Sequence, residues 1–153
     1  MKKHSIILLL ALSMVLSESK AGNPGETGPK SATTGSVVQL TNEGFKKMIF
    51  NHEVNKVWKF EGDKPAIIDF YADWCAPCRQ LSPLVEEIAK EYSGKIDVFK
   101  VDTEKEGILA QKLGITALPT LLFIPAEGKP QITMGVLPKK NLVKAINEIL
   151  LIK

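Results

Sequence analysis

The sequence has little of what a metal site requires. Its 153 residues include only two cysteines, Cys75 and Cys78, and two histidines. Structural zinc is held by about four ligands, whereas the part of the chain predicted to fold offers the two cysteines and His52 in a distant segment. We therefore expect no metal site. The main question that the sequence raises is what two thiols so close together do.

The chain also has no apolar run near its start that is long enough for a membrane anchor. Ile6 to Leu16 is apolar and spans 11 residues, whereas a spanning helix needs roughly 20. Lys2 and Lys3 precede this run and polar residues follow it, which is the order of a secretory signal peptide. The small residue Ala21 favours cleavage before Gly22. No cysteine lies at that point, which excludes a lipid anchor there.

A large excess of charge of either sign is missing as well. The formal net charge is +3, and removal of residues 1–21 takes away three basic residues and one acidic residue, leaving +1. This balance argues against binding to nucleic acid or to a membrane surface. Residues 22–36 contain no large apolar side chain and are rich in Gly, Pro, Ser and Thr, so we expect a flexible linker. Residues 37–153 then form the folded domain, which has no stable membrane insertion after signal cleavage.

Hydrophobic periodicity predicts the element order βαβαβαββα. The expected strands are Val37–Thr41, Ala66–Ala72, Asp97–Val101, Thr120–Ile124 and Gln131–Met134. The expected helices are 42–54, a helix that starts at Cys75 and ends near Gly94, Gly107–Leu113, and a last helix from Lys139. The strand from Ala66 is apolar except for Asp69, which is typical of a central strand covered on both faces. The order predicts an α/β fold with a central mixed sheet flanked by helices.

Cys75 stands where that central strand gives way to a helix, at the carboxyl end where α/β sheets place their sites. Backbone N–H groups at a helix start stabilise a thiolate, which favours Cys75 as the nucleophile. A spacing of three puts Cys78 on the same helix face, within disulfide reach. Pro77 is tolerated in the first turn. The stretch therefore predicts that Cys75 attacks and that Cys78 resolves.

A structural disulfide is an alternative reading of the two thiols. Closing so short a loop contributes only about 2 kcal/mol, and the domain has enough apolar sequence to fold without it. A redox-active pair is thus favoured over a structural disulfide or a metal site.

The stretch W-C-A-P-C-R, Trp74 to Arg79, resembles the thioredoxins, in which a similar strand is followed by W-C-G-P-C-K. Asp69 matches the buried aspartate of that family, and Pro83 matches its kinking helix proline. "GITALPT" matches G-I-x-x-x-P-T, which puts Pro119 at the cis-proline, and Gly135 matches a glycine near the site. The resemblance covers the whole predicted domain and implies a thioredoxin fold, in a secreted bacterial protein of the periplasmic type.

The resemblance also implies roles for individual residues. Asp69 would be a general base near Cys78, since burial raises the pKa of a carboxyl group. Lys100 would modulate that pKa. Residues expected to contact the substrate are Trp74, Ala76, Pro77, Thr116, Leu118, Pro119 and Gly135. Three alternatives stay open: Asp69 faces water, Lys100 is a solvated strand lysine, and Trp74 merely packs against the helix start.

The predicted function is reduction of protein disulfides through the Cys75/Cys78 dithiol–disulfide couple, without a dissociable cofactor. The expected partners are protein substrates and a membrane thiol–disulfide electron donor, and we expect a monomer in the periplasm or another exported location. One alternative is a disulfide oxidase or isomerase that runs the couple in reverse. Another is a non-catalytic thiol chaperone or metal-binding module. Ala76 replaces the usual glycine where the redox potential is tuned, so the direction stays open.

Overall fold

The computed structural model describes residues 35–151. The predicted signal peptide 1–21 and all but the last two residues of the predicted linker lie outside the described residues. The elements in chain order are β1 Val37–Gln39, α1 Asn42–Met48, β2 Ala66–Tyr71, α2 Ala76–Glu91, β3 Asp97–Asp102, α3 Gly107–Lys112, β4 Thr120–Ile124, β5 Gln131–Met134 and α4 Lys139–Ile149. The predicted order of strands and helices is therefore confirmed.

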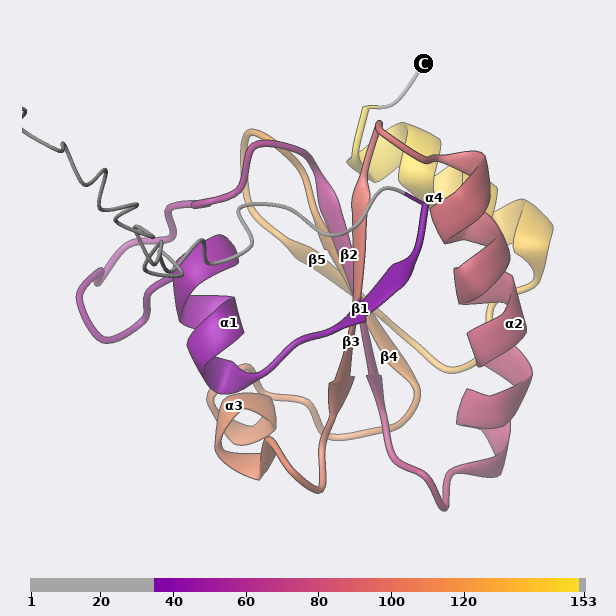
Figure 1. Ribbon diagram of the computed structural model, residues 1–153, viewed down its shortest axis with the longest axis horizontal. Coiled ribbons are helices and arrows are strands. Elements are labelled where there is room, and N and C mark those ends of the chain that lie inside the picture. Colours follow the sequence, from indigo (N-terminus) through magenta and orange to yellow (C-terminus); the bar gives the residue numbers. More distant parts are fainter. Residues whose placement is uncertain (1–34, 152–153) are drawn as a thin grey trace, which may run out of the picture.

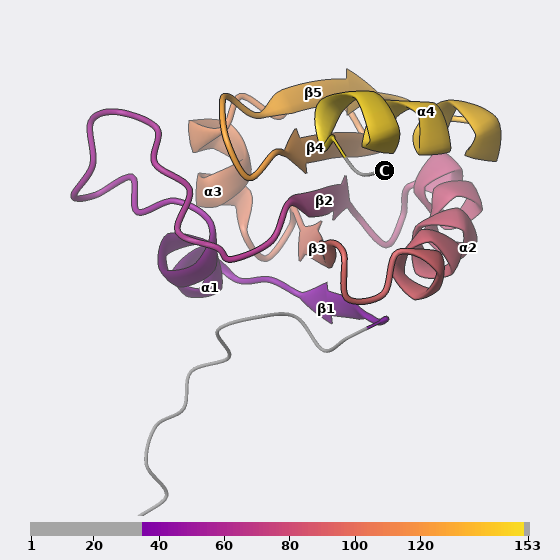
Figure 2. The ribbon, with the colours of Figure 1, turned by 90° about the horizontal axis from the view of Figure 1, so that it is seen from above.

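The strands form one mixed sheet in the order β1-β3-β2-β4-β5. Strands β1, β3 and β2 run parallel, whereas β4 and β5 are antiparallel to their neighbours. Helices α1 and α3 cover one face of the sheet, and α2 and α4 cover the other (Figures 1 and 2). This is the α/β arrangement, with helices flanking a central mixed sheet, that the sequence predicts.

Strand β2 is central, and residues 66–70 are all buried. Its side chains alternate between two apolar cores because successive residues of a strand point to opposite faces. Ile67 packs with Leu81 of α2 and Ile146 of α4, whereas Ile68 and Phe70 pack on the side of α1 and α3. The carboxyl end of β2 is thereby held rigidly between two packed layers.

The helix predicted over 42–54 ends at Met48, so its predicted C-terminal part is wrong. Asn51 Oδ1 accepts a hydrogen bond from the backbone N–H of Glu53 at 3.1 Å, a local turn that competes with helix. His52 consequently lies after the helix, and its Nε2 is 3.3 Å from Asn42 Oδ1. Trp58, in the loop that follows, packs against the core beside Phe50, with ring centroids 4.9 Å apart.

Candidate active site

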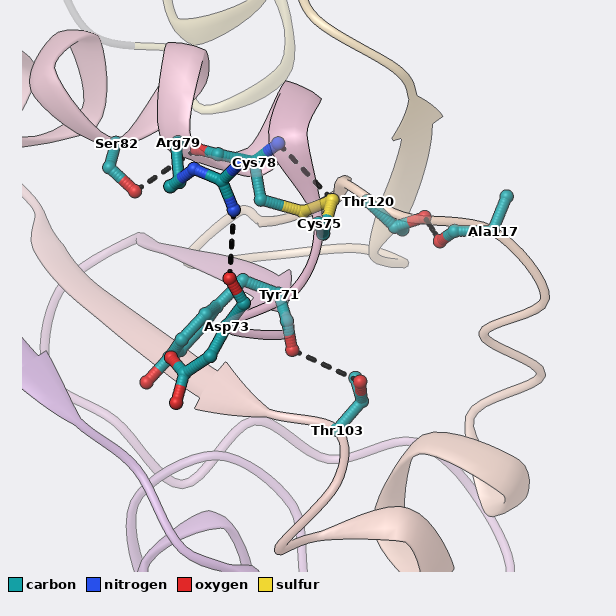
Figure 3. The surroundings of a disulfide bond; sticks show 9 residues. All are labelled: Tyr71, Asp73, Cys75, Cys78, Arg79, Ser82, Thr103, Ala117 and Thr120. Carbon is teal, nitrogen blue, oxygen red and sulfur yellow. Dashed lines mark hydrogen bonds between the residues drawn. A yellow bond between two sulfur atoms is a disulfide. The ribbon is translucent and has the colours of Figure 1, made fainter.

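Cys75 and Cys78 form a disulfide at the start of α2, with an S–S distance of 2.05 Å and Cα atoms 5.2 Å apart (Figure 3). Cys75 is the N-cap of the helix, and its Sγ accepts a hydrogen bond from the backbone N–H of Cys78 at 3.2 Å. An N-cap side chain faces the unpaired N–H groups of the first turn. The same position would stabilise a Cys75 thiolate once the disulfide is reduced.

The disulfide is buried although the residue before it is not. Cys75 is 2% exposed and Cys78 is 1% exposed, whereas Trp74 is 68% exposed. Arg79 Nη1 donates a hydrogen bond to the backbone oxygen of Asp73 at 2.9 Å, which ties the loop before the disulfide to α2 (Figure 3). Trp74 is therefore exposed beside the buried disulfide, and the alternative that it merely packs against the helix start does not hold.

A groove of about 460 Å³ lies beside the disulfide. It is lined by Trp74, Cys75, Ala76, Pro77, Thr103, Ala110, Ile115, Thr116, Ala117 and Leu118. The structure thus brings together five of the residues predicted to contact substrate. Sequence reasoning missed Thr103, Ala110, Ile115 and Ala117; two of these lie within "GITALPT" itself, and the loop after β3 gave no signal of its own.

Pro119 and Gly135, also predicted to contact substrate, are not among the residues that line this groove. The peptide bond between Leu118 and Pro119 is cis, as the resemblance implied. Gly135 adopts φ 84°, a left-handed conformation that favours glycine, and its N–H donates to the Pro119 carbonyl at 2.8 Å. Thr120 Oγ1 donates to the Ala117 carbonyl at 2.7 Å (Figure 3). These contacts hold in place the backbone of residues 115–118, which lines the groove opposite the start of α2.

Asp69 lies in the middle of β2 and is 3% exposed, so the alternative of a water-facing aspartate does not hold. Its Oδ1 is buried and has no hydrogen-bond partner among the described residues. Burial raises the pKa of this carboxyl from 3.8 to about 7, while the positive charge of Lys100 acts in the opposite direction. Such a group exchanges its proton near neutral pH, as a general base must.

Lys100 is the β3 partner of Asp69 in the sheet register. It is partly buried, and its Nζ lies 5.7 Å from the centroid of the Tyr71 ring. It is therefore more than a solvated strand lysine, and its charge lowers the pKa of Asp69. Within residues 35–151 there is no group of three or more His, Cys, Asp or Glu side chains that could hold a metal ion. In the same part of the chain, no helix has the length and apolar character to cross a membrane.

Residues 36–148 match the Thioredoxin family model. The chain belongs to the thioredoxin family. A thioredoxin of Borreliella burgdorferi is 46% identical over 110 residues, covering 70% of this chain and 94% of that protein. A chloroplastic M-type thioredoxin of Spinacia oleracea is 34% identical over 128 residues, covering 81% of this chain and 69% of that protein.

A crystal structure of chloroplastic thioredoxin z matches with a TM-score of 0.64 and 28% identity, covering 74% of this chain and 94% of that one. The predicted thioredoxin fold is therefore confirmed, and so is the predicted enzyme class. The chain is a thiol–disulfide oxidoreductase with its redox pair at Cys75 and Cys78.

Proposed function

We propose that this thioredoxin reduces disulfide bonds in exported proteins, outside the cytoplasm. The observation that carries disulfide exchange with a protein substrate is the groove of about 460 Å³ beside a buried disulfide at a helix N-terminus, and the similarity to thioredoxins favours the reducing direction. Thr116 and Ala117 are exposed residues of this groove, and an extended substrate segment would pair with the backbone there. A substrate disulfide seated there would meet Cys75, which lines the groove, whereas Cys78 does not line it.

The reaction begins with the reduced protein. The Cys75 thiolate attacks one sulfur of the substrate disulfide, the substrate S–S bond breaks, and the second substrate sulfur leaves as a thiolate that takes up a proton. A mixed disulfide now joins Cys75 to the substrate. Cys78 then loses its proton and attacks Cys75 Sγ, which forms the Cys75–Cys78 disulfide and releases the first substrate sulfur. Two electrons have passed to the substrate, and the protein is in the oxidised form that the structure contains.

Asp69 would accept the proton that Cys78 loses in the second step. Its carboxyl is buried, and its pKa of about 7 lets it act as a base at neutral pH. Lys100 would keep that pKa from rising further, because its charge favours the carboxylate.

Export is supported by the basic start, the apolar run Ile6 to Leu16 and the small residues before Gly22. We propose that residues 1–21 are removed and that residues 22–36 form a linker to the folded domain, which acts as a soluble periplasmic monomer. Each turnover leaves the protein oxidised, so a thiol–disulfide electron donor in the membrane would re-reduce it. N-terminal sequencing of the exported protein should begin near Gly22; retention of Met1 would contradict export by cleavage.

An insulin reduction assay, together with the Cys75/Cys78 midpoint potential, tests the direction of electron flow. We expect insulin to be reduced and the potential to lie near that of reducing thioredoxins, about −270 mV. A potential about 150 mV higher, in the range of strong disulfide oxidants, would make the protein an oxidase or isomerase. Client binding without any disulfide turnover would instead make it a thiol chaperone.

A further inference from the structure

The carboxyl group of Asp69 borders a small cavity on the side of the sheet that α2 covers. The cavity has a volume of about 20 Å³ and is lined by Val37, Asp69, Ser82, Val85, Glu86 and Lys100. A volume of roughly 10–15 Å³ is enough for one water molecule, provided that polar groups surround it. Asp69, Ser82, Glu86 and Lys100 supply such groups from three different elements, so the cavity is suited to an ordered water molecule.

Ser82 links this cavity to the resolving cysteine. Its Oγ donates a hydrogen bond to the backbone oxygen of Cys78 at 3.1 Å, one helical turn earlier in α2 (Figure 3). The same side chain borders the cavity beside Asp69. Ser82 is thus the one residue that both lines the cavity and makes a hydrogen bond to Cys78, among the contacts of the described residues.

A second hollow adjoins the cavity. It has a volume of about 260 Å³ and shares Val37, Glu86 and Lys100 with the inner cavity, and it extends to Gly35, Ser36 and Lys90. Neither hollow shares a lining residue with the groove beside the disulfide. The groove takes Ala76 and Pro77 from the first turn of α2 and Ala110 from α3, which lies across the sheet from α2 (Figures 1 and 2). The two hollows instead take residues from later turns of α2 and from β1 and β3. The groove and the two hollows therefore have separate linings.

We propose that these two hollows are a proton path from Asp69 to solvent, separate from the substrate groove, and that Ser82 is the positioning residue that orients a water molecule within it. This proposal rests on the proposed function, in which Asp69 takes the proton of Cys78. The proton passes from Asp69 to the water molecule and then, between Glu86 and Lys100, to bulk solvent. No bond other than those to the proton is made or broken on this path.

A separate path lets Asp69 release its proton while a substrate occupies the groove. A bound substrate would cover the groove, whereas the two hollows share none of its lining residues and would stay open to solvent. The charged groups around the inner cavity are Lys100 from β3 and Glu86 from α2, while β1 contributes only the apolar Val37. Asp69 can consequently return to its basic form while a substrate still occupies the groove.

Replacement of Ser82 by alanine tests the path. The readout is single-turnover reduction of a disulfide-bonded substrate protein by the reduced full-length protein, followed by rapid acid quench and mass spectrometry as a function of pH. In S82A we expect the mixed disulfide to decay about 5- to 10-fold more slowly, a part of the usual contribution of acid–base catalysis. The pH midpoint should move upward, because the carboxylate loses a hydrogen-bonding partner that reached it through water. The substrate KM, measured separately in steady-state turnover, should not change.

Matched variants separate this role from a purely structural one. S82T keeps the hydroxyl group and should restore the wild-type pH profile. Gln80→Ala, an exposed change on the same helix, should leave both rate and profile unchanged. An S82A profile identical to that of the wild type would overturn the proton path, because a hydroxyl that only bonds within the helix would not move the midpoint.

The variant Asp69→Asn distinguishes failure of the path from failure of the proposed function. If D69N flattens the pH profile and S82A adds nothing to D69N, the two residues act in one path. If D69N flattens the profile while S82A leaves it as in the wild type, the path is wrong and the base is right. If D69N keeps the wild-type profile, the proposed role of Asp69 is wrong, and the proton path, which starts at Asp69, is wrong as well.

Discussion

The two sides of the disulfide differ in almost every physical property. On the groove side, Trp74 is exposed, the wall consists of a loop between α3 and β4, and the lining is mostly apolar. On the α2 side, Asp69 is buried with one unpartnered oxygen, and the cavity beside it is small and polar. The groove is large enough to receive a protein segment, whereas the cavity of about 20 Å³ at Asp69 has room for little more than one water molecule.

This difference indicates how one pair of sulfur atoms serves two tasks. Recognition needs exposed apolar contact and free backbone groups, and these would be destabilising in a core. Proton transfer near neutral pH needs a carboxyl group that water does not solvate freely. The sheet keeps the two environments apart while α2 presents the cysteines to both. Substitutions on the two sides should therefore affect different steps of the reaction.

Replacement of Cys75 by serine should abolish disulfide reduction, since serine at this position cannot form the mixed disulfide. An insulin reduction assay measures the loss. The matched variant Cys78→Ser should also fail in turnover, but it should accumulate a mixed disulfide between Cys75 and the substrate, visible by non-reducing electrophoresis and mass spectrometry. Accumulation with C75S instead of C78S would reverse the assigned order of the two cysteines.

Asp69→Asn acts on the buried side and should slow decay of the mixed disulfide by about 100-fold at neutral pH, the lower range for loss of a general base. The first step, attack by Cys75, should be much less affected, because Cys75 owes its reactivity to the helix start. Rapid-quench kinetics of the two steps checks this. Equal slowing of both steps would argue that Asp69 acts on the fold of the site rather than on the proton of Cys78.

The same variant should change how stability depends on pH. The folded protein keeps the Asp69 proton up to about pH 7, while the unfolded chain releases it near 3.8. The contribution of Asp69 to the free energy of unfolding is therefore greatest below pH 3.8. It is lost as the pH rises through the folded-state pKa of about 7, by about 4 kcal/mol in total. Urea unfolding of the oxidised protein at about pH 4 and about pH 8 measures it. D69N should lack this decline and should exceed the wild type in stability at the higher pH.

Trp74→Ala acts on the groove side and should lower kcat/KM for protein substrates by about 10-fold, as expected when an exposed aromatic contact is removed from a binding surface. Most of the loss should be in KM. Because Trp74 is 68% exposed, the free energy of unfolding should change by less than about 0.5 kcal/mol. Trp58→Ala is the matched control: it should lower stability, since Trp58 packs against the core, and leave KM unchanged.

Arg79→Lys should have the smallest effect. Lysine can still donate one hydrogen bond to the Asp73 carbonyl. It lacks the planar guanidinium group, whose Nη1 lies 2.9 Å from the Asp73 carbonyl oxygen in Arg79. We expect a change of about 2-fold or less in kcat/KM and almost none in stability, because the contact is exposed. Arg79→Ala should lower kcat/KM further if the contact positions Trp74, and equal values for the two variants would show that it does not.

Much of this architecture could be predicted from local patterns. The apolar run around Asp69 indicated a central strand, and β2 is indeed buried throughout its core. The bounds of β4 and β5 match the predicted ranges. The end of α1 could not be predicted in the same way, because apolar spacing continues past Met48 while the Asn51 turn ends the helix. Hydrophobic periodicity indicates which face of a helix a residue would occupy. It does not indicate where a side chain competes with the helix for backbone hydrogen bonds.

Local sequence patterns were enough to predict the order of the elements, the place of Cys75 and Cys78 at the start of a helix, and the presence of a carboxyl group inside an apolar strand. Those features depend on neighbours within a few residues. The folded structure was needed to show that Thr103, Ile115 and Ala117 share a groove with Trp74, and that Ser82 and Lys100 line a cavity with Asp69. Contacts between separate elements depend on how the helices pack on the sheet, and the spacing of residues along one element carries no record of that packing.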